Sequence, residues 1–121
     1  MRAYGDCTNA LYEYARVNYN RSAKRMSGQA EPEHEELRQE AYQSEVKARA
    51  AIGQVTFLSG SSHLDRALDQ VRESIRGLSD AHSPENLASR HRKIQEKLKE
   101  VLYEARTELR GKTEKLALPS E

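Results

Sequence analysis

The sequence contains few of the residues that form disulfides, aromatic cores or membrane spans. It has one cysteine, Cys7, no tryptophan and one phenylalanine in 121 residues. A single cysteine excludes an internal disulfide and fits a reducing compartment. No apolar run approaches the roughly 18 residues that span a bilayer, and no apolar signal-peptide core follows Met1-Arg2. These absences predict a cytoplasmic chain with no transmembrane segment.

An excess of charge of one sign is lacking too. The chain carries 20 Lys and Arg residues against 19 Asp and Glu residues, for a net charge of +1. Proteins dedicated to nucleic-acid binding usually carry a stronger basic excess. The charge balance therefore disfavours nucleic acid as the main partner.

Patterns that support catalysis or metal binding are missing as well. There is no Gly-rich phosphate loop and no Gly-x-Ser-x-Gly turn. Di-iron bundles use two Glu-x-x-His pairs, but this chain has only Glu31 to His34. Ser59 and His63 flank a short break, where turn and capping roles explain them. We therefore expect no enzyme activity and no cofactor, and we assign no catalytic, cofactor-binding or metal-binding residue.

The apolar residues that are present recur at helical spacing. Apolar residues make up 36% of the chain and charged residues 32%, which suits long amphipathic helices with a narrow apolar stripe. Helix starts and stops predict four helices, at about 3–27, 32–59, 63–80 and 84–110. Short connections then favour an all-α, antiparallel up-down-up-down four-helix bundle over residues 1–111, followed by a polar tail over 112–121. A three-helix arrangement, with the first helix docked onto a second copy, is the alternative.

Several residues mark the ends of these helices. Gly28 and Gly111 are expected to end the first and fourth helices. Ser62 is expected to cap the third helix in a variant of the capping box, with Asp65 in place of Glu. Ser83, followed by Pro84, is expected to cap the fourth.

The first helix carries more apolar surface than a bundle helix needs. Its apolar residues cover an arc of roughly 220°, against little more than 100° in an ordinary bundle helix. Either long tyrosines reach over neighbouring helices, or part of the arc meets another molecule. The second interpretation makes this helix a protein interface or homodimer seam formed by Tyr12, Tyr19 and Met26.

The second helix contains a run of small residues that includes Gly53. A glycine inside a helix costs about 1 kcal/mol relative to alanine, which close approach of another helix would offset. Packing within the chain is the favoured explanation, and a binding notch is the alternative.

Two basic clusters are expected at one end of the bundle. The first closes the first helix and the second opens the fourth. Together they form a surface for nucleic acid or an anionic membrane, against which acidic residues at the start of the second helix compete. The members of this basic surface are Arg21, Lys24, Arg25, Arg90, Arg92 and Lys93.

The order of these features resembles that of uncharacterised helical-bundle proteins common in actinomycete-type bacteria. The resemblance covers residues 4–111. It rests on Tyr4-Gly5-Asp6, on Ala48 to Ala51 with the following 55–60, on the stripe from Leu64 to Leu78, and on 105–109. It implies a bacterial setting and a helical bundle that is often the cytosolic part of a membrane-anchored protein. It implies no activity.

The sequence therefore predicts a non-enzymatic interaction or scaffold domain that binds a protein partner or itself through its first helix. The alternative is a bundle that binds nucleic acid or an anionic surface through its basic end.

Overall fold

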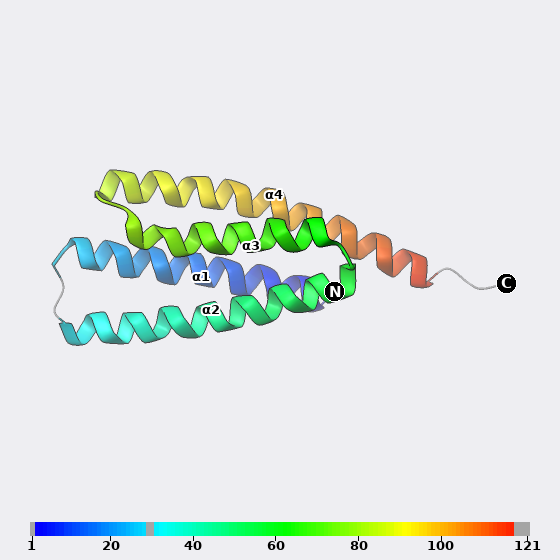
Figure 1. Cartoon of the computed structure of the whole chain (residues 1–121), viewed down its shortest axis with the longest axis horizontal. Helices are drawn as coiled ribbons and strands as arrows, with labels where there is room; N and C mark the ends of the chain where they lie inside the picture. Colours follow the sequence, from blue (N-terminus) through cyan, green and yellow to red (C-terminus); the bar gives the residue numbers. More distant parts are fainter. Residues whose placement is uncertain (1, 29–30, 118–121) are drawn as a thin grey trace.

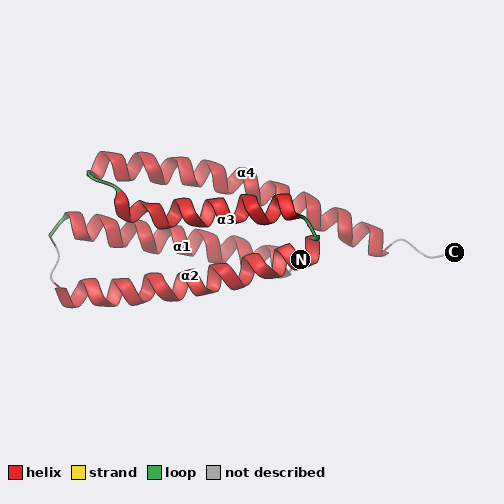
Figure 2. Ribbon diagram, viewed as in Figure 1, coloured by secondary structure: helices red, strands yellow, loops and turns green. Residues whose placement is uncertain are grey.

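The structure is a computed structural model that describes residues 2–28 and 31–117, and the side chains of 2–28 and 35–112. Its elements are α1 (Arg2–Met26), α2 (Glu31–Ser59), α3 (Ser62–Arg76), the 3₁₀ helix η1 (Gly77–Asp80) and α4 (Pro84–Ala117). Every regular element of these residues is helical, as Figure 2 shows. The predicted all-α class with four long helices is confirmed.

The four helices lie side by side along one axis (Figure 1). α1 ends and α2 begins at one end of the molecule, and η1 leads into α4 at that same end. α1 packs most extensively against α2 and also against α4, while α3 packs against α4 and α2. α2 forms one edge of the assembly, and the last turns of α4 extend past the other helices. No described helix is both long and apolar enough to cross a membrane.

The core follows the apolar stripes of the sequence. Apolar residues at helical spacing are buried along α3 and η1, and again along α4. These buried residues are Leu64, Leu68, Val71, Ile75, Leu78, Leu87, Ile94, Leu98, Val101, Ala105 and Leu109. Periodic burial of this kind stabilises each long helix through packing.

Two predicted helix ends are confirmed. Gly28 follows α1 with φ +79°, a left-handed conformation that glycine adopts without steric cost. At the start of α4, the Asn86 N–H donates to Ser83 Oγ at 3.0 Å, and Pro84 occupies the first helical position.

Two other predicted ends are wrong. The cap of α3 is Ser61, whose Oγ accepts from the Leu64 N–H at 3.1 Å, and Ser62 is already helical. The left-handed Gly60, φ +66°, completes the turn one residue earlier than expected. α4 also continues through Gly111, which does not have positive φ, as far as Ala117. Lys, Glu and Leu favour helix beyond this glycine. The rest of the predicted tail, 118–121, lies outside the described residues.

Candidate functional site

The groups with reactive chemistry are held in local structural roles. In the described part of the chain, no three His, Cys, Asp or Glu side chains gather where they would bind a metal. The Glu31–His34 pair lies outside the described side chains. Cys7 is fully buried, and burial raises the pKa of its thiol to about 11. The thiol is therefore protonated and unreactive at neutral pH.

The serine and histidine around the α2–α3 turn are also engaged locally. Ser59 Oγ donates to the Thr56 carbonyl at 3.2 Å and accepts from the Ser61 N–H at 3.2 Å. His63 Nε2 lies 2.9 Å from a carboxylate oxygen of Glu104 on α4. These contacts bind the turn together, and they tie the start of α3 to α4.

The three residues predicted as an interface on α1 lie at the border of its buried stripe. Tyr19 and Met26 are half-buried and pack against the core. The Tyr19 ring contacts the His91 ring of α4, with centroids 4.5 Å apart and planes 32° from parallel. Tyr12 is 37% exposed and lines a shallow groove between α1 and α2. Part of the wide apolar arc is thus accounted for within the chain, and Tyr12 is the most accessible of the three.

Two of the six predicted basic residues bind backbone carbonyls of η1. An Arg25 guanidinium N–H donates to the Ser79 carbonyl at 2.6 Å, and an Arg90 N–H donates to the Gly77 carbonyl at 3.1 Å. Ser22 Oγ donates to the carbonyl of Leu78, the residue between Gly77 and Ser79, at 3.2 Å. These bonds satisfy carbonyls at a helix end, where backbone acceptors lack helical partners.

The other four basic residues are spread around the same end of the bundle. Lys24, Arg92 and Lys93 are exposed. Arg21 is half-buried, and desolvation lowers the pKa of its guanidinium, with further lowering from the charges of Arg25 and Arg38. These residues therefore place several cationic side chains at one end of the bundle.

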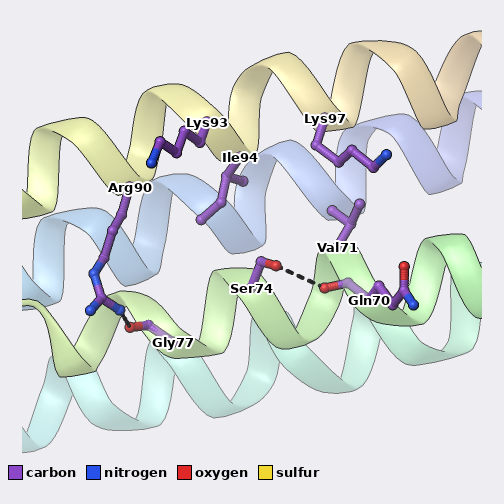
Figure 3. A pocket seen from close by; sticks show the side chains of 8 residues that line it. All are labelled: Gln70, Val71, Ser74, Gly77, Arg90, Lys93, Ile94 and Lys97. Atoms are coloured by element: carbon purple, nitrogen blue, oxygen red, sulfur yellow. Dashed lines mark hydrogen bonds between the residues drawn. The ribbon is translucent and has the colours of Figure 1, made fainter.

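A groove between α3 and α4 brings the second basic cluster together with an apolar floor. It has a volume of about 520 Å³. Figure 3 shows Arg90, Lys93 and Lys97 along its α4 wall, with Ile94 and Val71 below them. On α3, Ser74 Oγ donates to the Gln70 carbonyl at 3.0 Å. The groove thus offers cations above an apolar surface, and sequence analysis missed Lys97 as its third cation.

A second surface that sequence analysis missed is the outer face of α2. The helix buries one face in the core through Ala41, Ala48, Ile52 and Val55. Other large apolar side chains of the same helix are exposed: Tyr42 by 69%, Val46 by 50%, Phe57 by 86% and Leu58 by 46%. Isolated exposed apolar residues are ordinary, but a row of them on one helix is typical of an interaction surface.

The position of Gly53 corrects the favoured explanation at this residue, whereas Ala48 and Ala51 of the same run pack within the chain, in the core. We expected a neighbouring helix of the same chain to approach this glycine. Gly53 is instead exposed, and a Cβ placed there would meet nothing within 4 Å. Ala48, Ala51 and Ile52 form the core-facing side of this segment, and Gly53 lies on the outer face of the helix. The alternative explanation, a notch for a binding partner, stays a prediction.

A buried charge network connects the inner side of α2 to α1 and α3. Arg72 is 6% exposed, and its guanidinium lies 2.8 Å from Asp69, 3.0 Å from Glu73 and 3.6 Å from Glu45. The hydroxyl of Tyr14 donates to Glu45 at 3.5 Å. Burial, followed by the charge of Glu45, raises the pKa of Tyr14 to about 12. These ion pairs give the network a structural role, although Nη1 of Arg72 is buried without a hydrogen-bond partner among the described residues.

A protein-family model described as KilB plasmid transfer protein matches residues 1–109. No curated protein and no solved structure matches the chain significantly.

Proposed function

Since the chain belongs to the bacterial KilB plasmid transfer protein family, we propose that it serves plasmid transfer as a non-enzymatic interaction domain. In this proposal the domain is an antiparallel up-down-up-down bundle in the cytoplasm that binds a protein partner. The cytoplasmic setting is supported by the single buried thiol, Cys7, which suits a reducing compartment.

The outer face of α2 is the observation that carries the proposal. Phe57 is 86% exposed and Tyr42 is 69% exposed, although burying one such aromatic removes about 150–250 Å² of surface from water. Aromatic residues are enriched where proteins meet. The α1 residues Tyr12, Tyr19 and Met26 remain predicted contact residues, with less accessible apolar surface than α2.

The experiment compares plasmid transfer between donor and recipient cells that carry variants of the protein. We expect Phe57→Glu to lower transfer frequency by at least about tenfold, because a charge there would prevent burial of an interface anchor. The matched control is Tyr103→Glu on α4, where the side chain is 73% exposed and lies outside this face. Circular dichroism confirms that both variants keep wild-type helix content.

Equal transfer by the Phe57→Glu variant and the wild type would overturn the proposal for this face. An equal loss in Phe57→Glu and Tyr103→Glu would also contradict it, because the effect would not be specific to α2.

The α3–α4 groove supports a second candidate function, the binding of nucleic acid or an anionic membrane surface. Arg90, Lys93 and Lys97 all line this groove, so an anion bound there would lie near three cationic side chains. Phosphate contacts of this kind give affinity that falls steeply with salt.

Charge reversal tests this second candidate. The double variant Lys93→Glu, Lys97→Glu should lose retention on heparin at low salt, whereas Lys99→Glu, on another face of α4, should keep it. If the wild type is retained, duplex DNA and anionic vesicles then identify the class of ligand. A wild type that does not bind heparin at low salt contradicts this function.

A further inference from the structure

We infer that the outer face of α2 binds the same face of a second copy of this chain, with the two α2 helices antiparallel and centred between Arg49 and Ala50. The inference rests on the proposed function, in which this face is a protein interface, and names its partner. It places the homodimer contact on α2, whereas the sequence predicts it on the first helix.

The spacing of the exposed residues defines a single stripe. Tyr42, Val46, Ala50, Gly53 and Phe57 are all exposed. At 100° per residue they fall within a sector of roughly 80°. This sector lies opposite the core-facing side of the same helix, so a single partner helix packed along it would contact all five residues.

The sizes of these residues are complementary in one antiparallel register. When the pair is centred between residues 49 and 50, Val46 of one copy faces Gly53 of the other. Phe57 then faces Tyr42 of the other copy. The Val46 side chain enters the space that Gly53 leaves open, where no atom lies within 4 Å of a Cβ position. Both ends of the contact gain an aromatic pair, which is favourable beyond the area buried.

The charges beside the stripe do not oppose this pairing. Arg49 lies 3.4 Å from Glu45 in its own chain, so each copy brings a paired arginine toward the centre. The opposite border carries the uncharged amides Gln43 and Gln54 together with Lys47. Because the facing surfaces hold few unpaired charges, like-charge repulsion is small at this contact.

The apolar area is sufficient for a modest, reversible dimer. The exposed parts of Tyr42 and Phe57 supply on the order of 300 Å² in each copy. Val46 and Ala50 raise the total for both copies to roughly 800 Å², and a polar rim brings it toward the ~1,200 Å² at the lower limit of stable interfaces. We therefore expect a dissociation constant in the micromolar range.

Engineered cysteines test the register directly in the full chain. Ala50→Cys places two sulfurs next to the symmetry axis, so it should form a covalent dimer in a glutathione buffer. Val46→Cys and Gly53→Cys should each stay monomeric alone, because seven residues separate identical positions by about 10 Å along the helix, beyond the ~7 Å limit for a disulfide. Mixed together, these two variants should cross-link to each other. The natural Cys7 is fully buried and does not compete.

Three results separate this inference from the proposed function. Cross-linking of Ala50→Cys and of the Val46→Cys with Gly53→Cys mixture supports the antiparallel dimer. Self-cross-linking of Val46→Cys alone overturns the register. If none of the variants cross-links while Phe57→Glu still abolishes transfer, the second copy is the wrong partner, although the face remains an interface.

Discussion

His91 packs within the helical bundle and also affects how the stability of the protein depends on pH. It occupies a core position of α4, is half-buried, and contacts the Tyr19 ring. Burial lowers the pKa of its imidazole, because desolvation disfavours the charged form. The unfolded chain therefore binds this proton more readily than the folded chain, and His91 makes stability fall as pH drops below about 6.5.

We expect His91→Phe to reduce the difference in unfolding free energy between about pH 7.5 and about pH 5. Phenylalanine keeps an aromatic ring beside Tyr19 but cannot be protonated. Urea denaturation at the two pH values measures the difference. A His91→Phe variant with the wild-type pH dependence would show that burial of His91 is not responsible.

Single residues also show where the sequence predicts a role and where it does not. Periodicity places Tyr14 and Tyr19 on the same broad apolar arc, yet Tyr14 is fully buried and Tyr19 is half-buried. Arg25 and Arg90 belong to the predicted anion-binding surface, but their guanidinium groups bind carbonyls of η1. That role depends on how α1 and α4 approach η1, which is a tertiary contact without a sequence pattern.

At the scale of elements, local signals predict helix interiors better than helix ends. The first helix was predicted at 3–27 and is found at Arg2–Met26, and the cap at Ser83 is confirmed. Ser61 and Ser62 are adjacent and chemically identical, so the sequence alone does not decide between them. Gly60 decides it, because its left-handed conformation sets the direction in which α3 begins.

We expect Ser61→Ala to destabilise the protein by about 1 kcal/mol, because the Leu64 N–H would lose its acceptor. Ser62→Ala is the matched control, and its free energy of unfolding should stay within about 0.5 kcal/mol of the wild type. Urea denaturation of both variants measures the difference. The larger loss in Ser62→Ala would show that Ser62 is the cap.

α2 is the element that differs most from expectation. Its core stripe was predicted, but the exposed row from Tyr42 to Phe57 was not, since two apolar stripes on one helix are easily merged into a single broad pattern. Gly53 was a useful signal, because a glycine inside a helix predicts close approach of something. Among the residues that the structure describes, none outside the helix's own backbone comes within 4 Å of a Cβ placed there.

At the scale of the whole molecule, the sequence predicts the class and the number of helices because long amphipathic periodicity has few other solutions. The use of the surfaces is less predictable. A net charge near zero does not reveal that Arg90, Lys93 and Lys97 line one groove. Total apolar content likewise does not reveal the exposed apolar residues on the outer face of α2. Both surfaces depend on which helix sides the packing leaves open.

The most direct measurement of the central claim, that α2 joins two copies, is sedimentation equilibrium of the wild type across micromolar concentrations. We predict a reversible monomer–dimer equilibrium, weakened at least about 30-fold in Phe57→Glu and unchanged in Tyr103→Glu. A wild type that remains monomeric at several hundred micromolar, or a dimer equally strong in Phe57→Glu, would contradict it.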